Sequence, residues 1–541
     1  MTPRRQPTGR ATSRSSRPVR ACPGPADSVG TVSPSPTHRV AGDAGDAGDA
    51  GDAGDAGDAV DAVDAVDAVD AVDAVVVGSG PNGLAAAAVL VRAGHSVHVI
   101  EAAPDIGGGT RTEELTVPGL QHDVCSAVHP FGVASPLFAD LPLHEHGLAW
   151  RYAPVDVAQP LDGGRAGVLH RSLEETAAGM GPDGKRWART FGPLTARSPE
   201  LADDILGPLV HVPRHPPALA RFGLSAVQSA ALVARRWETP EVRGLFAGVA
   251  AHVYRPLSQP LTASAGMMFL AMGHRYGWPV AEGGSRAITD ALASYVTAAG
   301  GTIETGREVA SLDDLPPHRV ALFDVGPHAF ARIAGSRQPA RARRAYERYR
   351  YGPGAFKVDL AVEGGVPWTN DHVRQAGTVH LGGTFEEVAS AEAAIYRGTM
   401  PHRPFVLVAQ QYLADPGRSV GNVHPVWAYA HVPAGWTGDA TEAILDQIER
   451  FAPGTRDRVV GMAVRSTTDL ARHNPNYVGG DVATGANDPL QLVFRPRVTL
   501  HPYDTGIPGT YLCSAATPPG AGVHGMAGHH AAQRALKHLR G

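Results

Sequence analysis

The chain has 541 residues, of which 43% are hydrophobic and 19% are charged, and its net charge is −5. This length predicts more than one domain, because domains average roughly 150 residues. The lack of a basic excess excludes an electrostatic surface for nucleic acid. A membrane-spanning helix is not expected, because no run reaches the roughly 18 apolar residues that it needs.

The first 73 residues have the composition of a disordered tail. Residues 1–40 are rich in Arg, Ser and Pro, and residues 41–73 repeat Gly-Asp-Ala and then Val-Asp-Ala. Such a segment lacks the apolar side chains that bury a core. Two arginines at positions 4 and 5 resemble the start of a twin-arginine signal, but no apolar stretch follows them. A cytoplasmic location is therefore expected.

A strand, a glycine turn and a helix follow the tail and predict a dinucleotide-binding site. The apolar strand from Ala74 leads into a G-x-G-x-x-G turn. Its first glycine allows the tight turn, its second lets the backbone approach a pyrophosphate, and its third lets the helix pack closely. The positive end of the helix dipole then stabilises the phosphates. The expected contacts are Gly78, Gly80, Pro81, Asn82 and Gly83.

The next strand, residues 97–100, ends at an acidic residue where a ribose-binding carboxylate is expected. Glu101 stands about twenty residues beyond the turn. A carboxylate there binds ribose hydroxyls and repels a 2′-phosphate, which favours FAD or NAD over NADP. Residues 106–112, Ile-Gly-Gly-Gly-Thr-Arg-Thr, follow directly. Nicotinamide dehydrogenases have no use for this second glycine turn, so it favours FAD.

Two later segments repeat this chemistry. Residues 278–309 contain a Gly-Gly pair, an amphipathic helix through Ala298 and a strand after Gly300. Near the C-terminus, the strand 508–514 leads into a second G-x-G-x-x-G and a helix from about His529. Only sixteen residues follow Gly525, too few for a second nucleotide domain. This closing segment is therefore expected to return to the first dinucleotide site.

In this order the motifs resemble the flavin-dependent superfamily of amine oxidases and phytoene desaturases. Within it the chain is similar to phytoene dehydrogenase-like proteins, including the group called pyridine nucleotide-disulfide oxidoreductase domain-containing protein 2. The resemblance implies an α/β fold, with a discontinuous Rossmann-type FAD domain and an α+β substrate domain of helices and an antiparallel sheet. It also implies that FAD contacts Gly108, Gly109, Thr110, Arg111, Thr112, Val309, Gly522, Val523, Gly525 and Met526.

The predicted FAD-binding domain comprises residues 74–150, 275–335 and 485–541, and the predicted substrate domain comprises residues 151–274 and 336–484. Helices are expected over residues 169–274, and strands over 355–362 and 405–408. Residues 217–236 can form one helix with an apolar face and basic ends. That helix suits a hydrophobic tunnel or a peripheral membrane contact, and ordinary core packing explains it equally well.

The resemblance implies an FAD-dependent dehydrogenase or desaturase that removes a hydride from an apolar, carotenoid- or isoprenoid-like substrate. Its electrons would pass to oxygen, a quinone or NAD(P). His524 and Tyr477 are the candidate catalytic residues, although a loop contact and a pocket wall explain them too. Weaker candidates are His129, Lys357 and His431. An amine oxidase-like enzyme and a flavin-binding regulatory protein remain as alternatives.

Metal and disulfide chemistry are not expected. The sequence shows no metal-ligand spacing and no nucleophilic triad. Its three cysteines, Cys22, Cys125 and Cys513, have none of the spacings of a redox dithiol.

Overall fold

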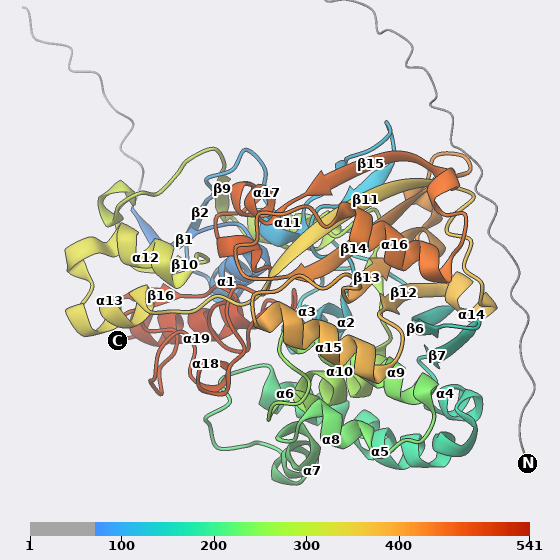
Figure 1. Ribbon diagram of the computed structural model, residues 1–541. Helices are drawn as coiled ribbons and strands as arrows, with labels where there is room; N and C mark the ends of the chain where they lie inside the picture. The colour runs from blue at the N-terminus through green and yellow to red at the C-terminus, as the bar shows by residue number, and fades with distance from the viewer. Residues whose placement is uncertain (1–70) are drawn as a thin grey trace, which may run out of the picture. The chain divides into compact units, whose positions relative to one another are not determined.

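Five parallel strands form the sheet that carries the dinucleotide motif. The computed structural model describes residues 71–541. The predicted tail lies outside these residues, except that its last residues, Val72 and Asp73, already begin the first strand. The strand order is β16-β10-β1-β2-β9 (Figure 1). The strands are β1 (Val72–Val77), β2 (Val97–Ile100), β9 (Thr302–Glu304), β10 (His318–Phe323) and β16 (Thr510–Leu512).

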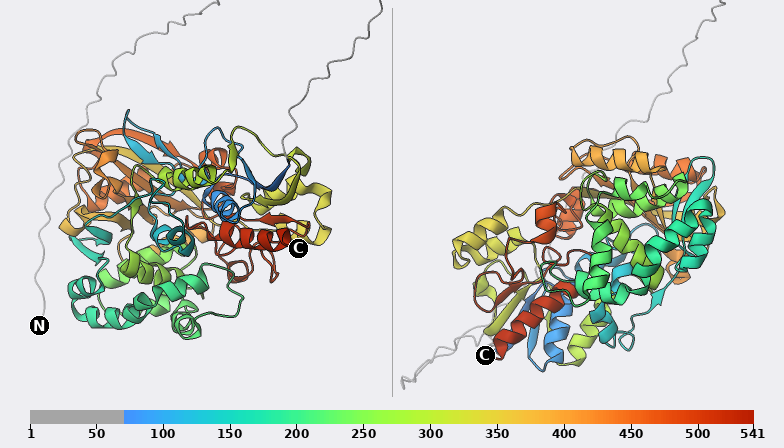
Figure 2. Two further views of the ribbon diagram at one scale, coloured as in Figure 1. Left: turned by 180° about the vertical axis from the view of Figure 1, so that it is seen from behind. Right: turned by 90° about the horizontal axis from the view of Figure 1, so that it is seen from below.

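Helices cover both faces of this sheet. Successive side chains of β1 point to opposite faces, so Ala74 and Val76 join one core cluster while Val75 and Val77 join another. On the first face lie α1 (Pro81–Arg92), α11 (Arg286–Ala298) and α19 (Met526–Leu539). On the other face lies α12 (Pro327–Ala334), with α13 (Ala340–Glu347) packed against it. Both views of Figure 2 show α19, in red, beside α1, in blue.

The second sheet has seven strands in the order β15-β11-β14-β13-β12-β6-β7. All neighbours pair antiparallel except β12 and β6, which are parallel. The apolar side chains of α16 (Thr441–Phe451) pack on one face. The strands are β6 (Val155–Leu161), β7 (Arg165–Leu169), β11 (Gly354–Glu363), β12 (Ala376–Leu381), β13 (Val406–Ala409), β14 (Val423–Val432) and β15 (Val459–Arg465).

This arrangement confirms the predicted fold class. The strands expected over residues 355–362 and 405–408 fall in β11 and β13. Sequence reasoning missed β6, which contains Pro160, and the edge strand β15, whose side chains alternate between exposed and half-buried. All strands of the parallel sheet come from the three segments expected to form the FAD-binding domain. The domain boundaries themselves stay a prediction.

The predicted single helix over residues 217–236 is wrong, because two helices stand there. The first ends at Ala226, and Ser229 begins the second by accepting a hydrogen bond from the N–H of Leu232. The N–H of Leu261 binds the carbonyl of Val227 between them, which holds the break. The helices of this region are α4 (Leu173–Gly179), α5 (Gly184–Ala196), α6 (Ser198–Ile205), α7 (Pro216–Ala226), α8 (Ala230–Ala234), α9 (Pro240–Ala250) and α10 (Ala263–Tyr276).

Short elements join these layers. They are β3 (Thr112–Glu114), β4 (Gln121–Asp123), β5 (Trp150–Arg151), β8 (Val280–Ala281), α2 (Pro130–Val133), α3 (Pro136–Asp140), α14 (Asp371–Arg374), α15 (Phe385–Tyr396), α17 (Thr467–His473) and α18 (Pro489–Val493). Within residues 71–541, no helix combines the length and the apolar composition needed to cross a bilayer.

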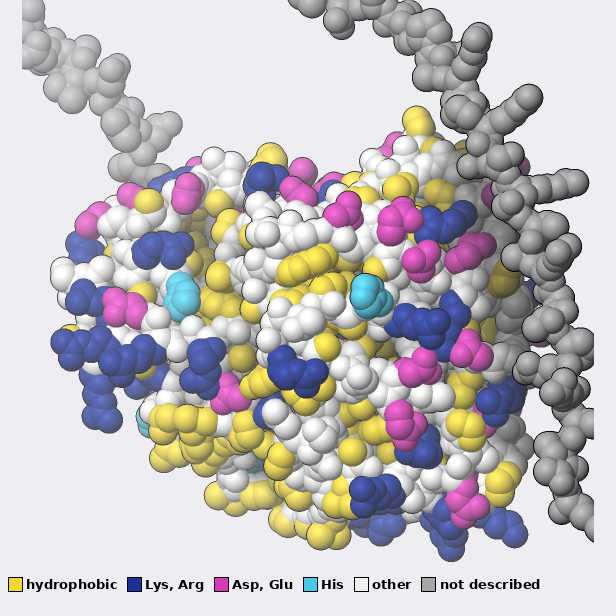
Figure 3. Space-filling model, in the orientation of Figure 1, with side chains coloured by type: hydrophobic (Ala, Val, Ile, Leu, Met, Phe, Trp, Pro, Cys, Tyr) yellow, Lys and Arg dark blue, Asp and Glu magenta, His cyan; other side chains and the backbone are white. Residues whose placement is uncertain are grey.

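Exposed apolar side chains gather along one edge of the surface (Figure 3). Large exposed examples near α7, α8 and α18 are Leu209, Val210, Val212, Leu224, Val227, Leu232, Leu490, Val498 and Leu500. Peripheral membrane contact through such a surface stays a prediction.

Candidate functional site

A cavity of about 1180 Å³ lies at the carboxyl ends of the parallel strands. Residues that directly follow β1, β2, β10 and β16 line it, including Gly78, Glu101, Asp324 and Ser514. Ligands of open α/β sheets bind at this edge. The volume exceeds the roughly 300–1,000 Å³ of a usual small-molecule site. The cavity therefore has room for an extended dinucleotide together with a second molecule.

The glycine turn before α1 forms one wall of the cavity. Gly78 has φ = +98°, in the left-handed region that favours glycine, and Pro81 occupies the first turn of α1. A Cβ at Gly83 would lie 2.0 Å from the carbonyl oxygen of Gly78, so the helix packs on the turn as predicted. Gly78, Gly80, Pro81 and Asn82 line the cavity, whereas Gly83 does not. The Asn82 Oδ1 is buried without a hydrogen-bond partner, which suits a ligand.

Glu101 is held rigidly at the end of β2. Its Oε2 accepts hydrogen bonds from the backbone N–H (2.8 Å) and hydroxyl (2.7 Å) of Ser79, and its Oε1 accepts one from the N–H of Ala103. The Arg111 guanidinium lies 3.7 Å from Oε1 and donates to the carbonyl of Asp105. Both Glu101 and Arg111 line the cavity. The carboxylate is thus oriented in advance at the position expected for a ribose.

The second glycine turn is only partly brought to the cavity. Gly108, Gly109 and Arg111 line it. The Thr110 hydroxyl instead donates to the carbonyl of Gly107, and the Thr112 hydroxyl donates to Asp123. The structure therefore gives these two threonines protein partners in the place of the predicted ligand. Val309, after β9, does line the cavity.

The C-terminal loop lines the same cavity as the first glycine turn. Gly522 and Val523 face it, and Val523 has φ = +52°, a conformation that costs a β-branched residue energy and is typical of functional loops. Gly525 and Met526 do not line it; a Cβ at Gly525 would lie 2.8 Å from the Cβ of Ala85. Segments more than 400 residues apart in the chain therefore meet around one cavity.

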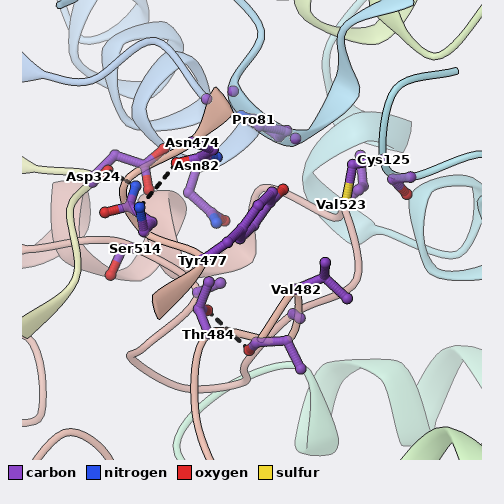
Figure 4. Close-up of a pocket in the computed structure, with 18 of the residues that line it drawn as sticks. Pro81, Asn82, Cys125, Asp324, Asn474, Tyr477, Val482, Thr484, Ser514 and Val523 are labelled. Carbon is purple, nitrogen blue, oxygen red and sulfur yellow. Dashed lines mark hydrogen bonds between the residues drawn. The ribbon is translucent and has the colours of Figure 1, made fainter. Parts of the chain in front are cut away.

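The two candidate catalytic residues have different positions. His524 is buried behind the cavity wall, where its Nδ1 accepts a hydrogen bond from the N–H of Met526 and burial lowers its pKa to about 4. Tyr477 lies inside the cavity, with Asp324 on one side of it and Cys125 and Val523 on the other (Figure 4). Burial raises the pKa of Tyr477 well above its usual value. The catalytic roles stay predictions.

The other end of the cavity is an aromatic compartment that the sequence did not reveal. It lies between the second sheet, α2 and α10. The hydroxyls of Tyr254 and Tyr429 are 2.9 Å apart, and Tyr254 has φ = +55°. The Nε2 atoms of His252 and His380 are 3.1 Å apart, and burial lowers the pKa of His252 to about 3. The aromatic lining comprises Phe131, His252, Tyr254, Phe269, Trp278, Trp427 and Tyr429.

Lys357 brings a buried amine to this compartment. It stands on β11 directly opposite Tyr429, forms an ion pair with Asp359 and lies 5.7 Å from the Trp427 ring centroid. Burial lowers the pKa of Lys357, since the ion pair offsets only part of the lost hydration. The sequence carries a signal for this site, because Lys357 and Asp359 are charged alternate residues in an otherwise apolar strand.

The weaker histidine candidates do not reach the cavity. The His129 Nε2 lies 2.8 Å from the Ser285 hydroxyl, and burial lowers the pKa of His129 to about 4. The His431 Nδ1 lies 2.8 Å from Glu392. Neither histidine lines the cavity, so each serves packing in the described residues.

The fold and the cavity define the class: the chain is an NAD(P)- or FAD-binding Rossmann-type protein with an amine oxidase-like fold. Residues 76–141 match the family described as an NAD(P)-binding Rossmann-like domain. The chain is 25% identical, over 86% of its own length and 93% of the relative's, to pyridine nucleotide-disulfide oxidoreductase domain-containing protein 2 of Rattus norvegicus. The resemblance predicted from the sequence is thereby confirmed.

Other relatives are more local or more distant. One of the limonene dehydrogenase polypeptides of Castellaniella defragrans is 30% identical over 25% of each chain. Putrescine oxidase bound to putrescine has a TM-score of 0.55 at 19% identity, covering 87% of this chain and 99% of its own. Cyclohexylamine oxidase of Brevibacterium oxydans has a TM-score of 0.52 at 18% identity, covering 87% and 100%. These two structures show the shared fold.

Proposed function

We propose that the protein is an FAD-dependent oxidoreductase that removes a hydride from an apolar, carotenoid- or isoprenoid-like substrate. The observation that carries the proposal is the continuous cavity, which joins the dinucleotide-binding turn to the aromatic compartment. A dinucleotide bound along the glycine turns would extend from Val309 past Glu101 towards the loop at Gly522. Its far end would then meet the compartment that Tyr429 and Lys357 line.

The residues present fit FAD. The turn at Gly80 and the Glu101 carboxylate suit a diphosphate and a ribose. The backbone at Gly522 and Val523 faces the cavity, where it can bind the polar edge of a planar ring. When bound, a flavin supplies the hydride acceptor, while the protein orients the substrate and excludes water.

The lining of the compartment favours an uncharged substrate over an amine. Among the described residues, no Asp or Glu from α10 or the second sheet lines the cavity, whereas Lys357 does. An ammonium group buried there would have no carboxylate partner, which is costly. The local similarity to a limonene dehydrogenase polypeptide also supports an apolar donor. The amine oxidase names of the fold neighbours support the alternative.

Anaerobic reduction of the purified protein tests the proposal. The flavin absorbance near the visible maximum should bleach with lipophilic polyene or terpene donors and remain with putrescine or cyclohexylamine. Bleaching by amines alone would establish the amine oxidase alternative. A yellow protein that no donor reduces would indicate a flavin-binding regulatory role. Reoxidation of the bleached protein with oxygen, a quinone and NAD(P) in parallel identifies the electron acceptor.

A further inference from the structure

A carboxyl group stands where the dinucleotide diphosphate is expected. Asp324 directly follows β10, and its Oδ2 accepts a hydrogen bond of 2.9 Å from the N–H of Gly83, in the first turn of α1. A Cβ at Gly80 would lie 2.6 Å from the same oxygen. Asp324 lines the cavity together with Gly78 and Gly80. The acid therefore occupies the positive end of the helix dipole that anions bind.

An ionised Asp324 and a diphosphate would repel each other at this place. Two like charges at close range in a partly desolvated site disfavour each other's ionised forms. A protonated carboxyl has no such conflict, because its O–H can donate to a phosphate oxygen. Binding of the diphosphate beside Asp324 is thus favoured by uptake of one proton from solvent.

The surroundings of Asp324 already favour its neutral form. Burial raises its pKa to about 7, and the hydrogen bond from Gly83 opposes only part of this effect. The charged or titratable groups that face it are Glu101, which raises its pKa further, and the buried thiol of Cys513. Elsewhere in the cavity, burial lowers the pKa of His252 to about 3 and that of His473 to about 4, so neither titrates above pH 6.

We propose that Asp324 is a dinucleotide-binding residue that contacts the diphosphate as a neutral acid, so that cofactor binding takes up a proton. This inference rests on the proposed function only in the choice of FAD, since any dinucleotide or nucleoside diphosphate on the glycine turn would meet the same carboxyl. The dissociation constant should rise with pH above about 7, by up to tenfold per pH unit for one linked proton.

Titration of the apoprotein with FAD and, separately, with ADP tests the proposal, with tryptophan fluorescence read at pH 6, 7, 8 and 9. For the full chain, both dissociation constants should increase at least tenfold between pH 7 and 9. Asp324→Asn should bind more tightly than the unchanged protein at pH 9 and lose most of this pH dependence. Asp105→Asn, which removes an exposed carboxylate elsewhere on the cavity lining, should keep it.

Calorimetry at pH 8 in two buffers of different ionisation enthalpy provides a second readout, and the unchanged protein should take up close to one proton. A flat pH profile, or an Asp324→Asn variant with the original slope, would overturn the role of Asp324. ADP and NAD binding with the expected slope, without FAD binding, would contradict the proposed cofactor alone. No binding of any of them at any pH would overturn both.

Discussion

Gly528 of α19 touches the backbone of Asn82 in α1 so closely that a Cβ at position 528 would lie 1.9 Å from the Asn82 carbonyl oxygen. This contact fixes the last helix of the chain against the first. The loop that precedes α19 is thereby held over the cavity, where Gly522 and Val523 line it opposite the turn of α1. The packing of two helices thus completes the site.

Gly528→Ala should separate α1 from α19. Overpacking of this kind costs about 1–3 kcal/mol, so we expect a lower melting temperature and a reduced flavin content. Gly223→Ala in α7 is the matched control, because a Cβ there meets nothing within 4 Å. Equal flavin content and equal melting temperatures for the two variants would contradict this account of the helix contact.

Gly109→Ala should weaken cofactor retention by displacing Tyr477. A Cβ at position 109 would lie 2.1 Å from the Tyr477 hydroxyl oxygen. Tyr477→Phe removes that oxygen, so the double variant should recover part of the flavin that Gly109→Ala loses. The measurement is the flavin-to-protein absorbance ratio after gel filtration. If Gly109→Ala alone keeps its flavin, the close approach of these residues is unimportant for binding.

Substitutions at His524 separate loop positioning from proton transfer. Its Nδ1 accepts the Met526 N–H, and burial keeps the imidazole neutral. Asn can accept the same hydrogen bond, so His524→Asn should retain more flavin than His524→Ala. We expect both variants to keep the original pH profile of kcat. Loss of one limb of that profile in both variants would instead support a proton-transfer role.

The histidine pair in the aromatic compartment should make the fold sensitive to acid. Burial lowers the folded-state pKa of His252 to about 3, against about 6.5 in an unfolded chain. The unfolded state therefore binds more protons below pH 6.5, and stability falls as the pH decreases. His252→Gln should remove up to about 2 kcal/mol of the loss between pH 6.5 and pH 5. Urea unfolding at both pH values measures this loss.

The exposed His144→Gln is the control for this series, since solvent surrounds its side chain. Its unfolding midpoint should follow that of the unchanged protein at both pH values. An identical acid loss in the His252→Gln variant would show that the pair is not the source of the sensitivity.

The sequence predicted the fold where local chemistry determines it. Gly78, Gly80 and Gly83 follow an apolar strand at a spacing that only a tight turn into a helix satisfies, and Glu101 ends the next strand. The sequence also predicted that the C-terminal glycines return to this turn, and Gly522 and Gly80 do line one cavity. That prediction depended on the order of motifs and on the short remainder of the chain.

The aromatic compartment could not be predicted in this way, because tertiary pairing creates it. His252 and His380 are 128 residues apart and meet only when α9 packs beside the second sheet. Tyr254 reaches Tyr429 through a left-handed backbone conformation that no local motif announces. Asp324 was missed because a lone acid after a strand is common, and only the fold places it at the start of α1.

Extraction of the bound ligand tests the central claim most directly. The full chain, reconstituted with FAD and passed through gel filtration, should release one FAD per chain on denaturation, and Gly80→Trp, which blocks the turn, should release almost none. Recovery of no isoalloxazine from the unchanged protein, or of the same amount from Gly80→Trp, would contradict the claim that the two ends of the described chain bind a single flavin dinucleotide.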